Sequence, residues 1–455
     1  MATTTSQPSS ATEHETEVRA TGTRITAGAD PASPAADAIS YEDLYARWER
    51  GNWSAMELDF SEDARQWREE FTEFERRAAV WNYGLFFWGE DAVADNLSPY
   101  IDAAPLEEQK YFLATQQVDE ARHAVFFKRF MHEVCGIGDG SMSSGLSTVK
   151  PQLTPGFRKI FDRLDRMADE LRADRSPSQL AAAVTLYHIV IEAALAQPGQ
   201  HFIGTYLEER DQLPAFRKGM ENITADEQRH IGFGVKLLSD LNREDPVGVP
   251  RAVARILSDV TRFTSQVLMP PGWDERYLTV FNATFDTVGV EGLTSLTTKL
   301  RSAGMPIEHL PGPTLLPAGL SPLEISQRGR ALAKAGVIGV REGPSARDSE
   351  TVALMFDTVA RQVNPRHGLA RSITLQWEFT DPDVPTWHLT VNNGSSAVAQ
   401  GAAPKPDLRL RVAYQDWVDI VGERLDPVRA MATGKLRPRG NPLALARLRK
   451  LFPRA

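Results

Sequence analysis

The chain has 455 residues, which is more than one ordinary domain needs, so we expect two or three domains. A hydrophobic fraction of 42% and a charged fraction of 24% are typical of a globular protein, and the net charge of −9 argues against the basic surface that nucleic-acid binding requires. The single cysteine, Cys135, excludes a disulfide framework and any zinc or iron–sulfur site built from cysteines.

Residues 1–40 are rich in Ala, Thr, Ser and Pro and lack the apolar core of a secretion signal. We therefore predict a disordered tail followed by a cytoplasmic protein. No apolar run approaches the length of a membrane span.

From Tyr41 to Met305 the sequence pattern is helical. Residues 105–136 have Pro at their start, Glu in the first turn and Gly at the end, and their apolar residues recur at helical spacing. The pattern predicts further helices over residues 63–97, 177–206, 213–241 and 250–270. We predict one helical domain over residues 41–309.

Four prolines and two glycines in residues 310–322 indicate a linker. Beyond it, short alternating segments predict strands and one longer segment predicts a helix. The expected strands are 372–379, 386–391, 396–401 and 408–414, and the expected helix is 414–424. We predict a smaller α/β domain over residues 323–455.

Two short segments are nearly identical, DEARH at 119–123 and DEQRH at 226–230. In each, a glutamate precedes a histidine by three residues, so both side chains lie on one face of a helix. Carboxylate and imidazole groups are good ligands for iron and manganese. Two such pairs, each joined by one further carboxylate, form the site of ferritin-like di-iron and di-manganese proteins.

This arrangement requires a lone acidic residue one helix before each pair. Glu90 follows an aromatic run ahead of the first pair, with adjacent Asp91 as the alternative, and Glu192 is the only acid within VTLYHIVIEAALA. An acid in such an apolar segment is costly to bury without a partner. The predicted ligands of two metal ions are Glu90, Glu120, His123, Glu192, Glu227 and His230.

Residues next to these ligands suggest supporting contacts. Asp119 and Asp226 are predicted to accept a hydrogen bond from the histidine of the opposite pair, with a solvated acid as the alternative. We interpret Arg122 and Arg229 as surface residues. His188, four residues before Glu192, is interpreted as a core histidine, with a place facing the same site as the alternative.

These motifs resemble the ribonucleotide reductase small-subunit superfamily and, within it, the ligand-binding oxidases. The resemblance covers Tyr41 to Met305 and includes WSAMELDFSEDARQW, GEDAVADNLSPY and YHIVIEAALA. It implies a ferritin-like bundle whose metals are manganese and iron or two irons. Phe127 stands where a true reductase subunit carries its radical tyrosine, and a domain replaces the C-terminal docking tail, so nucleotide reduction is not expected.

Resemblance to the ligand-binding oxidases implies O2 activation, a long-chain fatty acid beside the metals, and an ether crosslink between a valine and a tyrosine. The matching residues are Val93, three after the first ligand, and Tyr187, five before the third carboxylate. Gln200 departs from the tyrosine that these oxidases tend to carry. We also expect a homodimer.

Residues 356–452 resemble the sterol-carrier-protein family of lipid-binding domains, through the run PDLRLRVAYQDWVDIVGERLDPVRAMATGKLRPRGNPLALARLRKLF. The resemblance implies an apolar tunnel. Candidates for its core and lining are Trp417, Val418, Val421, Met431 and Leu436. From Pro427 onward the chain has eight Lys or Arg and no acid, which favours either weak contact with an anionic membrane surface or a solvated face.

Together these features predict an all-α ferritin-like helical bundle followed by a smaller α/β sterol-carrier-protein-like domain. The predicted function is an O2-activating dinuclear metal oxidase, with Mn/Fe or Fe/Fe, that acts on a fatty-acid-like or other apolar molecule. The alternatives are an N-oxygenase or desaturase on the same scaffold, and a non-catalytic lipid- or metal-binding protein.

Overall fold

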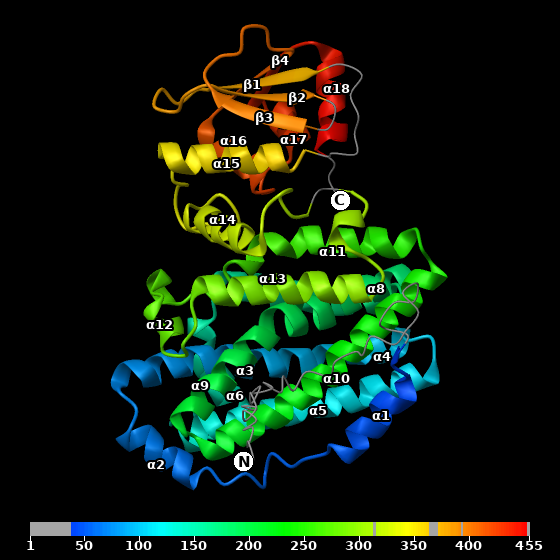
Figure 1. Cartoon of the computed structure of the whole chain (residues 1–455), viewed down its shortest axis with the longest axis vertical. Coiled ribbons are helices and arrows are strands. Elements are labelled where there is room, and N and C mark those ends of the chain that lie inside the picture. The colour runs from blue at the N-terminus through cyan, green and yellow to red at the C-terminus, as the bar shows by residue number, and fades with distance from the viewer. Residues whose placement is uncertain (1–37, 313–314, 364–371, 393–394, 453–455) are drawn as a thin grey trace, which may run out of the picture.

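The computed structural model describes residues 38–312, 315–363, 372–392 and 395–452, and Figure 1 shows a helical domain below a smaller domain that contains the sheet. The helices of the first domain are α1 Tyr41–Arg50, α2 Ser61–Glu69, α3 Glu73–Asn96, α4 Ser98–Ala103, α5 Glu107–Glu133, α6 Met142–Val149, α7 Pro155–Ala173, α8 Pro177–Val184, α9 Gln197–Arg210, α10 Pro214–Glu244, α11 Gly248–Thr264, α12 Arg276–Thr279 and α13 Phe285–Ser302. A π-helical segment, η3 Thr185–Ala196, joins α8 to α9, and 3-10 turns cover η2 Lys150–Gln152, η4 Pro271–Trp273 and η5 Ile307–His309.

Four long helical units frame the interior of this domain: α3, α5, the continuous α8–η3–α9 unit, and α10. Helix α3 packs against α5, and α10 packs against both α5 and η3. The sequence marks their starts, because Thr72 and Glu75 form a capping box at α3 and proline opens α8 and α10. The prediction of one helix over residues 63–97 was wrong, since the Thr72 cap starts a new helix after α2 ends.

Aromatic side chains fill the space between these helices. Phe126, Phe130 and Phe216 are fully buried, and the ring centroids of Phe130 and Phe216 lie 4.1 Å apart. Phe127, the position of the radical tyrosine in a reductase subunit, is also fully buried and stacks on Phe86. This packing holds the helices that carry the predicted ligands at fixed spacing.

Residues Pro177–Arg210 form one helical stretch that is long and apolar enough to cross a membrane by length and composition alone. The expectation that no apolar run has this length was therefore wrong. However, 78% of its apolar window is buried within the protein, so its apolar character serves the core of the helical domain. Its central 12 residues are π-helical, a form that is rare and concentrated at functional sites.

The second domain contains a five-stranded mixed sheet among the described residues. Its elements are α14 Pro322–Lys334, α15 Ser349–Arg361, β1 Ile373–Phe379, β2 Trp387–Asn392, β3 Ser395–Gln400, β4 Leu408–Val412, α16 Tyr414–Val421, α17 Pro427–Ala432, β5 Leu436–Gly440 and α18 Pro442–Leu451. The strand order is β3-β2-β1-β4-β5, and only β1 and β4 run parallel.

The four predicted strands are present, whereas β5 was not predicted. Its sequence, LRPRG, contains Pro438, which lacks the N–H that a central strand needs. The structure accommodates this proline because β5 pairs only with β4 and lies at the edge of the sheet.

The two domains are joined by specific contacts. Helix α14 packs against α13. The buried side chain of Gln266 donates to the carbonyl of Val340 at 2.9 Å and accepts from its N–H at 2.8 Å. An ion pair between Arg262 and Glu423, 2.8 Å long, also crosses the boundary. Gln266 and Arg262 belong to the helical domain, so these contacts fix the second domain on the α11–α13 side of the bundle.

Candidate metal centre

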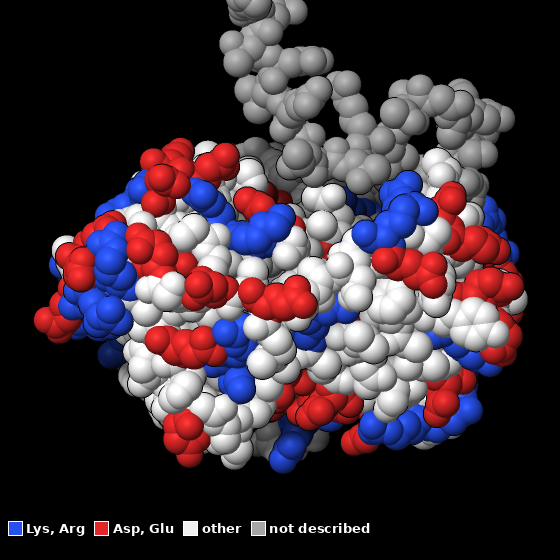
Figure 2. All heavy atoms as spheres, turned by 90° about the horizontal axis from the view of Figure 1, so that it is seen from below, with Lys and Arg blue, Asp and Glu red and all other residues white. Residues whose placement is uncertain are grey.

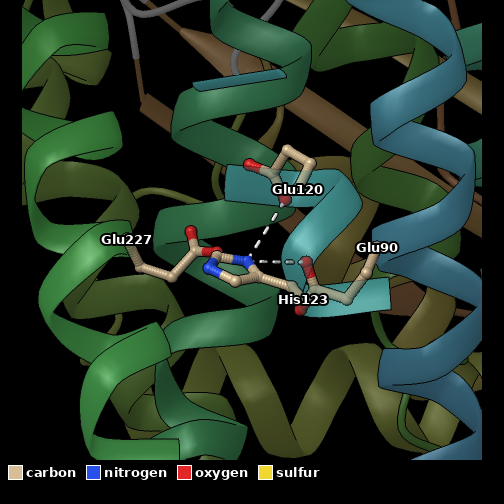
Figure 3. Close-up of side chains that lie close together, drawn as sticks. All are labelled: Glu90, Glu120, His123 and Glu227. Atoms are coloured by element: carbon tan, nitrogen blue, oxygen red, sulfur yellow. Dashed lines mark hydrogen bonds and ion pairs between the residues drawn. The ribbon is translucent and has the colours of Figure 1, made fainter. Parts of the chain in front are cut away.

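The structure brings all six predicted ligands together inside the helical domain. They come from α3 (Glu90), α5 (Glu120 and His123), η3 (Glu192) and α10 (Glu227 and His230), and every one is buried. They form two groups whose ligand atoms lie within 4.8 Å of one another: Glu90, Glu120, His123 and Glu227 in the first, and Glu120, Glu192, Glu227 and His230 in the second. Figure 3 shows the first group, in which Glu90 and Glu227 converge from other helices on Glu120 and His123 of α5.

Glu120 and Glu227 belong to both groups, whereas the other four residues belong to one group each. Two adjacent cations could therefore be held here, with Glu120 and Glu227 available to both. Asp91, the alternative to Glu90, is not part of either group. Glu90, and not Asp91, therefore lies on the face of α3 that points toward the cluster.

The Nδ1 atom of each histidine faces the carboxylates. His123 Nδ1 lies 3.3 Å from Glu90 and 3.6 Å from both Glu120 and Glu227. His230 Nδ1 lies 3.1 Å from Glu120, and also within 4 Å of Glu192 and Glu227. Both imidazoles thus present the same nitrogen to the cluster.

The other nitrogen of each histidine meets an aspartate from the opposite pair, as predicted. His123 Nε2 lies 3.1 Å from Asp226 Oδ2, and His230 Nε2 lies 3.2 Å from Asp119 Oδ2. An ionised carboxylate can only accept, so Nε2 carries the proton and donates it. Nδ1 is then left with a lone pair directed at the carboxylate cluster, which is the form that binds a metal ion.

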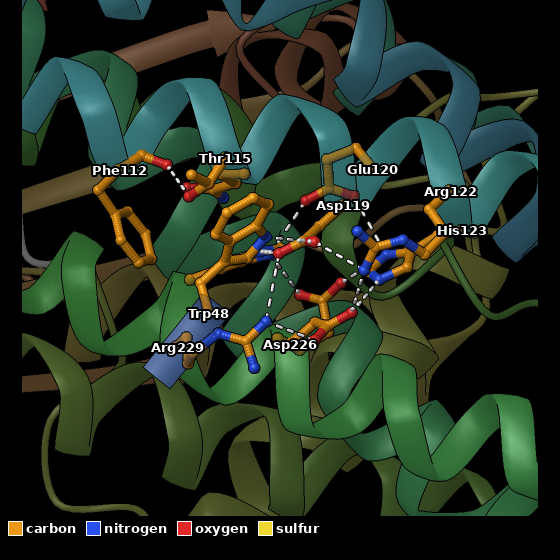
Figure 4. Close-up of polar contacts among 12 residues, drawn as sticks. Trp48, Phe112, Thr115, Asp119, Glu120, Arg122, His123, Asp226 and Arg229 are labelled. Atoms are coloured by element: carbon orange, nitrogen blue, oxygen red, sulfur yellow. Dashed lines mark hydrogen bonds and ion pairs between the residues drawn. The ribbon is translucent and has the colours of Figure 1, made fainter. Parts of the chain in front are cut away.

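Arg122 and Arg229 are not surface residues, which corrects the sequence-based interpretation. Arg229 is 8% exposed, donates to Asp226, and lies 3.3 Å from Asp119. The Arg122 side chain lies 3.0 Å from Asp119 and within 4 Å of Asp226. Figure 4 shows the guanidinium of Arg229 beside both aspartates. The two arginines therefore balance the charges of the two aspartates that hold the histidines.

Two tryptophans that the sequence analysis missed also donate hydrogen bonds to these two aspartates. Trp48 Nε1 donates to Asp119 at 2.9 Å, and Trp53 Nε1 donates to Asp226 at 2.8 Å. Trp48 lies on α1 and Trp53 on the segment that follows it, 71 and 173 residues from their partners. No local pattern marks this relationship, because it depends on where α1 packs against the bundle.

Gln116 was also missed, although its position four residues before Glu120 places it on the same face of α5. Its Nε2 donates to Tyr187 at 2.9 Å and to Glu192 at 3.1 Å, and its Oε1 lies 3.2 Å from His188 Nε2. His188 is fully buried and outside both ligand groups, as expected of a core histidine, and burial lowers its pKa to about 3. Gln116 therefore connects this helix to η3.

Tyr187 and Val93 flank the cluster on different elements. Tyr187 is buried in η3 and donates to Glu120 Oε1 at 2.6 Å. Val93 is buried in α3, three residues after Glu90, and thus on the same face of that helix. Gln200, the other departure noted in the sequence, is buried, and among the described residues its amide atoms have no hydrogen-bond partner.

The electrostatics of the cluster call for cations. Burial raises the pKa of Glu90 to about 8 and that of Glu192 to about 7, and it raises the pKa of Glu227 well above its ordinary value. Burial acts in the same direction on Glu120, but in the metal-free protein the protonated forms of His123 and His230 beside it outweigh burial and lower the Glu120 pKa. Without added positive charge, part of this cluster has to take up protons.

The residues present fit two divalent cations. Four glutamates bring four negative charges, which two such ions would neutralise, while the two aspartates already face two arginines. Glu192 Oε2, Glu227 Oε2 and His230 Nδ1 are buried and accept no hydrogen bond from any described residue. Oxygen and imidazole donors suit iron and manganese.

The surface of the helical domain remote from the sheet carries both signs of charge. Figure 2 shows acidic and basic side chains interspersed over this face, with no large basic patch.

Fold and site together define a ferritin-like helical domain with a buried carboxylate–histidine cluster. The family model for the ribonucleotide reductase small chain matches residues 37–262, and the model for the alkyl sulfatase C-terminal domain matches residues 342–455. The helical domain is therefore like the small chain of ribonucleotide reductase. These matches do not support the predicted resemblance of the second domain to sterol carrier proteins, because they assign its residues to the alkyl sulfatase C-terminal model.

Similar solved structures include R2-like ligand-binding oxidases. One with an aerobically reconstituted Mn/Fe cofactor is 22% identical, with a TM-score of 0.50, over 58% of this chain and 92% of that chain. A single-residue variant with an aerobically reconstituted Fe/Fe cofactor is 21% identical, with the same TM-score, over 58% of this chain and 93% of that chain. These neighbours carry Mn/Fe or Fe/Fe cofactors, and at this identity the likeness establishes the shared fold.

Proposed function

We propose that this protein is an O2-activating oxidase with two metal ions, Mn/Fe or Fe/Fe, that acts on an apolar substrate. One observation carries the proposal: two overlapping four-ligand groups share Glu120 and Glu227 in a buried pocket. When bound, two reduced ions in such a site supply the electrons that activate O2 for oxidation of a nearby C–H bond.

Each residue of the centre has a defined task in this proposal. Glu90, His123, Glu192 and His230 would each help to hold one ion, while Glu120 and Glu227 would contribute to holding both. Asp119 and Asp226 fix the tautomer of the histidines. The aromatic packing around α5 and α10 excludes water, which protects oxidising chemistry from side reactions.

The substrate is proposed to be apolar because the second domain contributes an apolar lining close to the bundle. Four of the five residues that the sequence suggested as tunnel lining (Trp417, Val421, Met431 and Leu436) border a cavity between the domains. Val418 does not line it and lies fully buried in the core. Weak membrane contact through the basic end, and a cytoplasmic location, remain predictions.

Oxygen consumption tests the proposal. Chelator-treated full-length protein is loaded anaerobically with Fe(II), with or without Mn(II), and O2 uptake is followed on exposure to air. We expect uptake in proportion to bound metal, which Glu120→Ala abolishes and Glu221→Gln, a change at an exposed position of α10, leaves intact. Metal binding without stoichiometric uptake would instead identify a carrier or storage protein.

An N-oxygenase or desaturase would use the same centre, so O2 uptake does not separate these reactions. Mass spectrometry of organic extracts from the purified protein would separate them, because it identifies the bound molecule directly. An aromatic amine would favour N-oxygenation, whereas an alkyl chain would favour C–H oxidation or desaturation.

A further inference from the structure

A large cavity lies between the two domains. Its volume is about 1280 Å³, which exceeds the usual range for pockets that hold drug-sized ligands. Its walls come from η3, α11, α13 and α14 on one side, and from β1, β4, α16, α17 and α18 on the other. In Figure 1, α11, α13 and α14 lie where the helical domain meets the smaller domain. Neither domain encloses this space alone.

The cavity is predominantly apolar, and its few charged groups are paired. The basic residues in its lining are Arg262, Arg328 and Arg330. They form ion pairs with Glu423, Asp357 and Asp286, at 2.8, 2.6 and 2.8 Å. A carboxylate inside the cavity would therefore find no uncompensated positive charge among the described residues, and burying it would be costly.

Two indole donors in the wall have no acceptor among the described residues, and neither do Arg262 Nε and Arg328 Nη1, although both guanidinium groups are in ion pairs. Trp377 and Trp417 both line the cavity, are 2% and 7% exposed, and have ring centroids 5.0 Å apart. Neither indole Nε1–H finds a hydrogen-bond acceptor among the described residues. A buried indole N–H usually has a partner, so these two groups indicate an acceptor that a ligand supplies.

We infer that this cavity is a single binding site, shared by both domains, for an uncharged long-chain molecule with a hydrogen-bond-accepting oxygen. Fatty alcohols, ketones and esters have this chemistry, whereas an ionised fatty acid does not. The chain packs against the apolar walls of both domains, and the oxygen accepts from Trp377 or Trp417.

The cavity is separated from the candidate metal centre by one helical segment. Val190 and Ala194 of η3 line the cavity, while Glu192 between them belongs to the ligand cluster. Residues two apart on a helix project to different sides, so η3 forms the wall between cavity and cluster. At Gly292, a Cβ atom would lie 2.6 Å from the carbonyl of Ala194, so glycine allows α13 to approach this wall closely. That the bound molecule is the substrate rests on the proposed function; the binding itself does not.

Binding of a matched pair of probes tests the charge requirement. Full-length protein, delipidated and free of metal, is titrated with methyl palmitate and with palmitate, and complexes are measured by native mass spectrometry. We expect the ester to bind at least about tenfold more tightly than the acid, because only the acid buries a charge. Equal or tighter binding of the acid would overturn the inference.

Cavity-filling variants test whether both domains contribute. Thr261→Trp on α11 and Met431→Trp on α17 each project bulk into the lining, and each should weaken ester binding at least about tenfold. Their controls, Arg255→Trp on α11 and Ala432→Trp on α17, change exposed residues that do not line the cavity. Loss of binding only with Met431→Trp would place the site in the second domain and overturn the shared site.

A brominated ester gives a readout that does not depend on those variants. Methyl dibromostearate quenches tryptophans that it contacts, so it should quench the native protein and quench Trp417→Phe less. Unchanged quenching in that variant would contradict the inferred position. Since every measurement uses metal-free protein, a failure of O2 uptake would leave this result standing, and absence of ester binding would not affect the metal centre.

Discussion

His123 Nε2 lies 3.1 Å from Asp226, and the same aspartate accepts from Trp53 at 2.8 Å and from Arg229. His230 has the equivalent arrangement with Asp119, Trp48 and Arg229. Each histidine is thus held by an aspartate that belongs to the other Glu-x-x-His helix. These reciprocal hydrogen bonds connect α5 to α10, and they fix the direction in which both Nδ1 lone pairs point.

Replacing Asp226 with asparagine should weaken metal binding without unfolding the protein. Asparagine keeps an acceptor oxygen for His123 but removes the charge that raises the basicity of its imidazole. We expect a loss of metal affinity of about ten- to a hundredfold, measured anaerobically by competition with a chelating dye. Asp119→Asn should act similarly through His230, and Glu221→Gln should have no effect. Unchanged affinity in both aspartate variants would show that these contacts do not support the site.

The sharing of ligands between the two groups predicts different metal stoichiometries for different variants. Glu90→Ala removes a ligand from the first group alone, so the protein should retain one tightly bound ion. Glu120→Ala removes a ligand from both groups and should lose both ions. Metal content after dialysis, measured by elemental mass spectrometry, checks this difference. The same content in the two variants would contradict the assignment of Glu120 to both groups.

The resemblance to ligand-binding oxidases predicts an ether bond between Val93 and Tyr187. Its formation breaks one C–H and one O–H bond, makes one C–O bond, and passes two protons and two electrons to O2. Aerobic loading with metal should therefore lower the intact mass by two hydrogen atoms. Tyr187→Phe, which also loses the hydrogen bond to Glu120, should keep its calculated mass. An unchanged mass in the native protein would remove the crosslink.

Much of the site was predictable because helical periodicity acts over short distances. A glutamate three residues before a histidine lies on the same face of a helix. An acidic residue inside an apolar helix is buried, and a buried carboxyl group requires a polar or charged partner. These two constraints identified the residues that the structure brings together. They also predicted that Asp119 and Asp226 reach the opposite histidines.

The rest depended on contacts that no local pattern encodes. Arginines are mostly found at the surface, so the sequence suggested exposed positions for Arg122 and Arg229. They contact the aspartates only because α5 packs against α10. The π-helical form of η3 and the positions of Trp48 and Trp53 also follow from tertiary packing. In the second domain, Pro438 concealed an edge strand, because a proline normally argues against a strand.

The expected homodimer has a candidate interface on α5. Tyr111, Ala114, Val118 and Ala121 share one exposed stripe of this helix, and Tyr111 and Val118 are 58% and 51% exposed. A contiguous apolar stripe on a helix favours association. Val118→Arg should convert the dimer to a monomer, as measured by light scattering after size exclusion. Leu323→Arg, a similar change at an exposed position of α14, serves as the control. A native protein that is monomeric would exclude this interface.

The buried carboxyl groups make the metal-free protein sensitive to pH. Burial raises the pKa of Glu90 to about 8 and of Glu192 to about 7, from an ordinary value near 4.5. Groups with raised pKa values contribute stability below their unfolded pKa and lose it as the pH rises through the folded value. The lowered pKa values of Glu120 and Asp226 matter only in acid, since their contribution is already complete above the unfolded pKa.

Between about pH 5.5 and pH 8.5, the melting temperature of the chelator-treated protein should therefore fall, because Glu90 and Glu192 are forced to ionise in a buried site. Metal binding should reverse this trend, since the ions replace the protons and gain affinity as the carboxyl groups ionise. Differential scanning calorimetry of the metal-free and metal-loaded protein measures both effects. The double variant Glu90→Gln, Glu192→Gln should reduce the fall in the metal-free profile, because its amides stay neutral throughout while Glu227, whose pKa is also raised, still titrates. A melting temperature that rises with pH in the metal-free native protein would show that other groups dominate its titration.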